Sequence, residues 1–209
     1  MNKEMKAVIQ PAQFDKTYFN TGNYQNYKKI SAMWSGRVAR RIKKDARKIA
    51  PRVLDVGCAY GYLMTVLQEL GCEVKGLEYS QYAVEQTEPV TRSKIKKGSI
   101  LENSFRQNEF DVVVCLNVLE YIPEAQVSKA LGHLVQWTGN LIFFTTCFTH
   151  SRYSSQKHSP DPLRLTVKTE KEWVKLFRQA GANFHDQFYD SGGGDVLVFK
   201  KRQPERAVS

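Results

Sequence analysis

The sequence predicts one α/β domain built on a doubly wound sheet that is mostly parallel and has an antiparallel last strand. From residue 52 onward, short apolar runs alternate with helical stretches, a pattern typical of βαβ units and a parallel sheet. A glycine-rich turn joins the first of these runs to a helix. The last two runs are joined only by residues 190–195, and this link is too short for a crossover helix. Those two strands must therefore be antiparallel neighbours.

The N-terminal part of the chain has a different pattern. Apolar side chains recur at three- and four-residue steps from Tyr24 to Ile49, which predicts one or two amphipathic helices ending before Pro51. We therefore expect an N-terminal helical cap over residues 1–50, a main α/β domain over residues 51–202 and a tail over residues 203–209.

Local signals place the elements of the main domain. Gly71 ends the first helix, Ser80 is the expected N-cap of the second, and Thr169 with Glu172 forms a capping box before the last. A weak strand is expected near Ile95. The other expected strands cover residues 52–56, 73–77, 110–115, 141–147, 183–189 and 196–200. The expected helices cover residues 62–70, 81–86, 124–136 and 170–180.

Length and composition exclude several classes of protein. With 209 residues, 42% of them hydrophobic and 25% charged, the chain has the composition of one ordinary globular domain with a small appendage. It contains no run near the ~18 apolar residues of a membrane span, and its start lacks the apolar core of a signal peptide, so we expect a cytoplasmic protein. The cysteines form no CxxC pair and are expected to be reduced core residues, and the spacing of histidines and cysteines indicates no metal site. These cysteines are Cys58, Cys72, Cys115 and Cys147.

The net charge of +10 is concentrated in one segment. Residues 28–52 hold ten basic side chains and one acidic one, a net +9, so the rest of the chain is almost neutral. The solvated face of an amphipathic helix is the expected explanation. If the segment has a macromolecular partner, we expect an acidic carrier protein at this basic helix, with nucleic acid less favoured and no membrane contact.

The stretch Val-Leu-Asp-Val-Gly-Cys-Ala-Tyr-Gly-Tyr at residues 53–62 carries the main functional signal. Small residues at Gly57, Ala59 and Gly61 let a ligand approach the backbone closely at the start of a helix. Glu78 follows Asp55 by 23 residues and ends the next strand, where a carboxylate can accept both hydroxyl groups of a ribose. Strand, turn, helix, strand and acid together indicate a nucleoside-bearing cofactor.

Asp55 favours a cationic cofactor. In a dinucleotide site the turn faces a pyrophosphate, which an acid at the end of the strand would repel. Together with residues 76–80 (Gly-Leu-Glu-Tyr-Ser) and 110–123, the turn resembles the class I S-adenosylmethionine-dependent methyltransferases of the small-molecule type. The resemblance covers residues 52–200 and implies a single Rossmann-like sheet with S-adenosylmethionine as the cofactor.

The resemblance also implies roles for individual residues. Asp55 and Gly57 would lie beside the methionine part of the cofactor, and Gly61 would allow the chain to pass close to the cofactor. Glu78 would hold the ribose and Tyr79 would flank the adenine. Leu116 and Asn117 would line the sulfonium end, although packing is an equal alternative for Leu116.

Two positions depart from the family pattern. Ala59 replaces the middle glycine, which requires a backbone angle that alanine can adopt. Gly98-Ser99 replaces the usual Gly-Asp pair, so the hydroxyl of Ser99 or the backbone of Ile100 must contact the adenine instead.

No fixed catalytic base is expected. Methyl transfer from a sulfonium is an in-line displacement, for which alignment and exclusion of water supply much of the rate. The motif Asn-Val-Leu-Glu at residues 117–120 differs from the Asn/Asp-Pro-Pro-Tyr of nucleic-acid amino-methylating enzymes and favours a small-molecule acceptor. Tyr121 stands where this branch of the family often has histidine.

The candidates on the reaction side are aromatic or imidazole side chains. Residues 148–167 follow the fifth strand without clear periodicity and are expected to form a lid. A lone loop histidine such as His150 is more often solvated than catalytic. The candidate catalytic residues are Tyr18, Tyr27, Tyr121, Tyr153 and His158.

Two alternative functions are open at this point. Aromatic faces attract a sulfonium, so an enclosed site without an acceptor could instead let the cofactor's own amine attack, as in enzymes resembling methyltransferases that form azetidine-2-carboxylate and methylthioadenosine. Besides methyl transfer and this cyclisation, the third hypothesis is a nucleic-acid-binding module or an inactive cofactor sensor that uses the basic helix.

Overall fold

The structure is a computed structural model that describes residues 9–21, 27–149, 161–190 and 194–203. Its centre is one seven-stranded sheet in the order β3-β2-β1-β4-β5-β7-β6. The strands are β1 Arg52–Val56, β2 Glu73–Glu78, β3 Ile95–Lys97, β4 Phe110–Leu116, β5 Thr138–Thr145, β6 Ala182–Asp190 and β7 Gly194–Lys201. The α-helices are α1 Lys16–Asn20, α2 Tyr27–Ala46, α3 Tyr62–Glu69, α4 Gln81–Gln86, α5 Pro89–Arg92, α6 Glu124–Trp137 and α7 Glu170–Ala180. Two short 3-10 helices are η1 Pro11–Gln13 and η3 Leu119–Tyr121.

The predicted fold class is confirmed. Strands β1 to β5 pair in parallel, and β7 lies between β5 and β6 and runs antiparallel to both. The strand order reverses where β1 neighbours both β2 and β4. In sheets of this kind, a ligand crevice forms beyond the carboxyl ends of the strands at that reversal.

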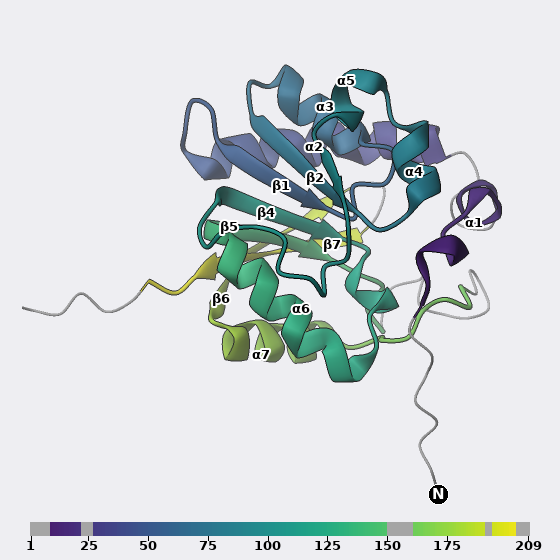
Figure 1. The fold of residues 1–209 in the computed structure, drawn as a ribbon. Coiled ribbons are helices and arrows are strands. Elements are labelled where there is room, and N and C mark those ends of the chain that lie inside the picture. Colours follow the sequence, from purple (N-terminus) through teal and green to yellow (C-terminus); the bar gives the residue numbers. More distant parts are fainter. Residues whose placement is uncertain (1–8, 22–26, 150–160, 191–193, 204–209) are drawn as a thin grey trace, which may run out of the picture.

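Helices cover both faces of the sheet (Figure 1). One apolar core includes side chains of α2 and α3 and the other includes those of α6 and α7. Helix α2 forms because Val38, Ile42 and Ala46 recur at four-residue steps and are all buried. The helix ends at Ala46, so Ile49 at the end of the predicted apolar stripe is 95% exposed.

Local end signals set the helix boundaries as predicted. The side chain of Ser80 accepts a hydrogen bond from the backbone N–H of Ala83, and Thr169 forms its capping box with Glu172. Gly181 ends α7 with a left-handed φ of 106°. Strand β5 begins at Thr138, three residues earlier than predicted, because it pairs there with Phe110 across an irregularity that places one extra residue in β5.

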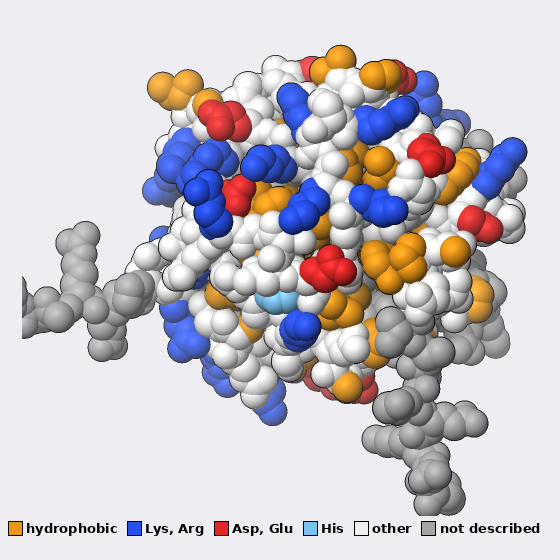
Figure 2. Space-filling model, viewed as in Figure 1, with side chains coloured by type: hydrophobic (Ala, Val, Ile, Leu, Met, Phe, Trp, Pro, Cys, Tyr) orange, Lys and Arg blue, Asp and Glu red, His pale blue; other side chains and the backbone are white. Residues whose placement is uncertain are grey.

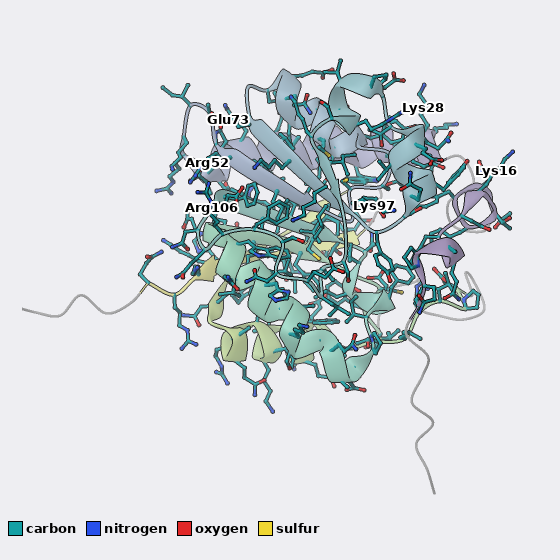
Figure 3. The ribbon with its side chains drawn as sticks, in the orientation of Figure 1. Lys16, Lys28, Arg52, Glu73, Lys97 and Arg106 are labelled. Atoms are coloured by element: carbon teal, nitrogen blue, oxygen red, sulfur yellow. The ribbon has the colours of Figure 1, made fainter. Side chains whose placement is uncertain are left out.

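The basic segment is spread across the molecule. A 20-residue helix such as α2 is about 30 Å long, and Figure 3 shows Lys28 and Arg52 on opposite sides of the view. In Figure 2, Lys and Arg side chains gather at the upper left, near Arg52. Part of this charge is paired, because Lys48 and Arg52 both contact the carboxylate of Asp111.

All four cysteines are buried and none is bonded to another, as the sequence predicted. Within the part of the chain that the structure describes, no helix combines the length and the apolar character needed to cross a membrane.

Candidate functional site

A cavity of about 520 Å³ lies at the carboxyl ends of β1, β2 and β4. Its floor includes the turn after β1 and the strand ends, and its cover includes Ile9, Phe14, α1 and the start of α2. Figure 1 shows α1 on the side toward which these strands point. Of the predicted cofactor residues, those that line the cavity are Asp55, Gly57, Ala59, Glu78, Tyr79, Ser99, Leu116 and Asn117.

The turn after β1 needs left-handed backbone at three positions. Gly57, Ala59 and Gly61 have φ values of 70°, 47° and 73°. A Cβ at Gly57 would lie 2.3 Å from Cγ2 of Val118, so this glycine is also required by close packing. A Cβ at Gly61 would instead meet Thr91, which places Gly61 against α5 rather than in the cavity wall.

The amides of this turn are already bonded inside the protein. The N–H groups of Gly57 and Cys58 donate to the carbonyl of Leu77, and that of Gly61 donates to the carbonyl of Cys58. The N–H of Ala59 donates to Oε2 of Glu78 at 2.7 Å. An anion cradle needs such amides to point at the ligand, so this part of the turn does not offer a pyrophosphate site.

Glu78 ends β2 and is buried. Its Oε1 accepts from the backbone N–H of Ser80 at 2.7 Å, while Oε2 accepts from Ala59. Burial raises its pKa, and the hydrogen bonds from the backbone amides oppose that effect. Each carboxylate oxygen has two lone pairs, so Glu78 can still accept hydrogen bonds from a ligand in the cavity.

Asp55 is the second buried acid of the site, with only 4% of its surface exposed. Desolvation and the nearby charge of Glu78 raise its pKa to about 8. No hydrogen bond reaches its side chain from any residue that the structure describes. A buried acid in this state is stabilised in its charged form by a cationic ligand group.

The remaining predicted cofactor residues lie around these acids. Ser99 Oγ accepts from the backbone N–H of Leu101 at 3.1 Å, so its oxygen is fixed in the loop after β3. Tyr79 donates to the carbonyl of Ile9 at 3.4 Å and thereby contacts the N-terminal segment. Asn117 follows β4 with a left-handed φ of 55°, a conformation that is uncommon outside glycine and often found at functional sites.

Two of the predicted reaction-side residues meet directly. The hydroxyl of Tyr18 donates to that of Tyr121 at 2.8 Å, and Tyr121 donates to Oδ2 of Asp161 at 2.8 Å. Tyr27 also lines the cavity. The other predicted residues, Tyr153 and His158, lie outside the residues that the structure describes, as does His150.

Aromatic side chains from the N-terminal segment cover the cavity. We call Phe14, Tyr18, Phe19 and Tyr27 the aromatic roof. The ring of Phe14 makes edge contacts with Tyr18 and Tyr121 at centroid distances of 5.0 and 5.4 Å. The π faces of such rings attract cations, so the roof and the two acids favour the same sign of ligand charge.

Three charged residues of the site were not among the site residues predicted from the sequence. Glu120 lines the cavity, is 1% exposed and accepts a hydrogen bond from the hydroxyl of Thr146 at 2.7 Å. Burial raises its pKa to about 7. Arg164 lines the cavity and Asp161 bonds Tyr121, and both belong to a loop with no periodic pattern. Only the acid and base in Asp-Pro-Leu-Arg at residues 161–164 could have drawn attention to them.

The arrangement suits a ligand that joins a nucleoside to a positively charged chain. Glu78 at a strand end can accept ribose hydroxyls, and Asp55 with the aromatic roof can stabilise a cation nearby. Among the described residues, no group of three His, Cys, Asp or Glu side chains is arranged to hold a metal ion.

The chain is similar in sequence to known methyltransferases. The family described as "Methyltransferase domain" matches residues 27–187. A ubiquinone biosynthesis O-methyltransferase of Nitrosococcus oceani is 31% identical over 66% of this chain and 62% of its own length. Another, of Colwellia psychrerythraea, is 35% identical over 46% of this chain and 41% of its own. The chain thus matches less than two thirds of the length of these relatives.

Solved structures share the fold. The magnesium protoporphyrin IX methyltransferase of Synechocystis PCC 6803, with bound SAH, superposes with a TM-score of 0.72 at 16% identity, covering 92% of this chain and 98% of that one. The PH0226 protein of Pyrococcus horikoshii OT3 superposes with a TM-score of 0.69 at 16% identity, covering 90% and 99%.

Proposed function

The chain belongs to the methyltransferase-domain family, and on that premise we propose that it binds S-adenosylmethionine in the cavity and transfers its methyl group to a small molecule by in-line displacement. The first curated relatives are O-methyltransferases, which supports an oxygen atom as the acceptor. When bound, S-adenosylmethionine supplies a methyl group on a positively charged sulfur.

One observation carries this proposal: two buried acids flank a glycine-rich turn whose amides at positions 57, 58, 59 and 61 are bonded internally. A dinucleotide needs free amides and no acid beside its pyrophosphate at the end of β1, whereas a nucleoside with a cationic chain is stabilised by such an acid and needs no anion cradle. S-adenosylmethionine is a ligand of the second kind.

Each residue then has a proposed role. Glu78 accepts from the ribose hydroxyls, Asp55 faces the charged methionine chain and Tyr79 flanks the adenine. Ser99 contacts the adenine in place of the usual acid. Leu116 and Asn117 line the sulfonium end. The turn residues Gly57, Ala59 and Gly61 give the backbone its shape, and the aromatic roof excludes water.

Calorimetric titration tests the assignment. We expect S-adenosylmethionine and S-adenosylhomocysteine to bind and NAD to show no measurable heat. Binding of NAD alone, or of none of the three, would overturn the proposal. Mass spectrometry of a phenol panel incubated with the protein and S-adenosylmethionine then tests methyl transfer.

Cyclisation of the cofactor is a second candidate, favoured by the aromatic roof. The hydrogen bond between Tyr18 and Tyr121 joins the N-terminal segment to the floor across the cavity, which would enclose the cofactor without an acceptor. Incubation of the protein alone with S-adenosylmethionine separates the two reactions. Rapid release of methylthioadenosine supports the cyclase forming azetidine-2-carboxylate, whereas slow background decay excludes it.

We further propose that residues 1–50 act as a cap on the α/β domain of residues 51–202, with residues 203–209 as a tail, and that the protein works in the cytoplasm. Buried cysteines that form no disulfide with one another support a reducing compartment. An acidic carrier protein would dock on exposed α2 side chains such as Arg37 and Arg40, because Arg41 is already paired with Asp45 and Asp186. Salt-dependent affinity for nucleic acid would instead support the third hypothesis.

A further inference from the structure

The hydroxyl groups of the reaction side form a hydrogen-bond chain with a fixed direction. Asp161 ends the chain with a carboxylate, which only accepts. Tyr121 must therefore donate to Asp161, and its oxygen is left to accept from Tyr18. The three residues come from α1, η3 and the loop before α7, so the tertiary fold alone brings them together.

The chain leads from the cavity toward the outside. Tyr18 and Tyr121 line the cavity, and Tyr121 is only 9% exposed. Asp161 is half-buried and does not line the cavity. Its Oδ1 accepts from the backbone N–H of Leu163 at 3.0 Å, so the turn holds the carboxylate in place while Oδ2 bonds Tyr121.

We infer that Tyr18, Tyr121 and Asp161 form a proton relay for an alcohol or phenol acceptor, with Asp161 as its outer positioning residue. This inference rests on the proposed function. The acceptor's O–H bond breaks and its oxygen forms a bond to the methyl carbon. The carbon–sulfur bond breaks with its electron pair going to sulfur. The proton passes through the tyrosine hydroxyls to Asp161, which releases it to solvent.

Two other charged groups face the relay. Glu120 precedes Tyr121 in the chain, and its carboxylate is bonded to Thr146. Arg164 carries a positive charge close to Glu120, Tyr121 and Asp161. Its charge stabilises negative charge on the relay after a proton has left. Glu120 is the competing base, and Asp161→Asn separates the two because it changes the relay while leaving the hydrogen bond from Thr146 to Glu120 in place.

The same hydrogen bonds could serve only to fasten the aromatic roof to the floor. A purely structural role would affect every acceptor equally, whereas a relay matters only for an acceptor that still carries its proton. Catechol and the more acidic 4-nitrocatechol have similar shapes, and at mildly alkaline pH only the second is largely ionised. The pair therefore distinguishes the two roles.

The experiment compares Tyr121→Phe and Asp161→Asn with the wild type on both catechols in the presence of S-adenosylmethionine. Asparagine keeps the turn and can still accept from Tyr121, but it cannot take up the proton. We expect kcat on catechol to fall about 100-fold or more, the lower range for loss of acid–base catalysis. With 4-nitrocatechol kcat should fall by less than about fivefold, because the attacking oxygen has already lost its proton to solvent.

A binding measurement without turnover completes the test. The dissociation constant for catechol binding to the complex of the protein with S-adenosylhomocysteine should change by no more than about fivefold in either variant. That change corresponds to the loss of one ordinary hydrogen bond. Tyr82→Phe is the matched control, because Tyr82 packs in the same aromatic cluster but does not line the cavity. Its kcat should stay at the wild-type value on both catechols.

Three outcomes would overturn the relay. Equal losses on both catechols, or loss of catechol binding, would assign the three residues to fastening the roof. Failure of the wild type to bind or methylate either catechol while it binds S-adenosylmethionine would overturn the acceptor class and leave the cofactor assignment standing. Failure to bind S-adenosylmethionine would overturn the proposed function as well.

Discussion

The carboxylate of Glu78 accepts the backbone N–H of Ala59 at 2.7 Å, and this contact joins the end of β2 to the turn after β1. One side chain therefore both shapes the turn and faces the cavity. Its second oxygen accepts from Ser80, the N-cap of α4. Loss of Glu78 should consequently affect stability and ligand binding together.

Glu78→Gln tests this double role. Glutamine has one acceptor oxygen, so one of the two backbone amides loses its partner in a buried place. We expect the free energy of unfolding to fall by about 1–3 kcal/mol and the affinity for S-adenosylmethionine to weaken at least about tenfold. Thermal unfolding and calorimetry measure the two effects. Glu73→Gln, at the exposed start of the same strand, should change neither, and unchanged affinity in Glu78→Gln would refute the ribose assignment.

The pKa of Asp55, raised to about 8, predicts proton release on cofactor binding. Near pH 6.5 the free protein holds a proton on Asp55, and a cationic ligand favours its removal, so affinity should rise as the pH rises toward 8. Calorimetry at pH 6.5 in buffers of different ionisation enthalpy reports the released proton. The cofactor's own amine, with a usual pKa of about 7.7–8.0, stays protonated there. Asp55→Asn should show no release.

The same raised pKa has a consequence for stability. Between pH 3.8 and about 8 the native state holds a proton on Asp55 that the unfolded chain has lost. The contribution of Asp55 to the free energy of unfolding therefore falls as the pH rises through this range. Asp55→Asn should unfold at a higher temperature than the wild type at pH 8, with a smaller difference at pH 5. A difference independent of pH would contradict the buried, protonated state.

The turn and the strand-end acid could be predicted because they are local. A glycine-rich stretch between an apolar run and a helix, followed by an acid at the end of the next strand, fixes both from sequence spacing alone. The same holds for the capping box at Thr169 and the antiparallel last strand, whose causes lie within a few residues.

The reaction side could be predicted only in part. Tyr18 and Tyr121 were expected as separate candidates, but 103 positions separate them and a further 40 separate Tyr121 from Asp161. Nothing in the spacing of these residues indicates their contact, which depends on how α1 packs over the cavity. At Ile49 the periodicity was misleading. The three- and four-residue spacing of apolar side chains continues to Ile49, although helix α2 ends at Ala46 and Ile49 is exposed.

Ala59 has a left-handed φ of 47°, so Ala59→Gly should relieve strain. The left-handed conformation costs a residue with a Cβ about 1–2 kcal/mol, while the freedom of glycine in the unfolded chain costs about 0.5–1 kcal/mol. We expect a net gain of up to about 1.5 kcal/mol, or a melting temperature higher by up to about 6 °C. Ala32→Gly, exposed within α2, should lower it by a similar amount. A lower melting temperature for Ala59→Gly would show that the turn is unstrained.

Gly57 and Gly132 should respond to alanine in opposite directions. At Gly57 a Cβ would lie 2.3 Å from Cγ2 of Val118, and φ is 70°, so Gly57→Ala must displace the residues after β4. We expect a loss of stability of about 1–3 kcal/mol, as for overpacking, together with loss of S-adenosylmethionine binding. At Gly132 in α6, nothing lies within 4 Å of the added atom, and alanine should stabilise the helix by about 0.5–1 kcal/mol without changing affinity. Thermal unfolding and calorimetry of both variants measure stability and affinity. If Gly57→Ala kept the wild-type stability and affinity, Val118 would move freely and the turn would not fix the wall of the cavity.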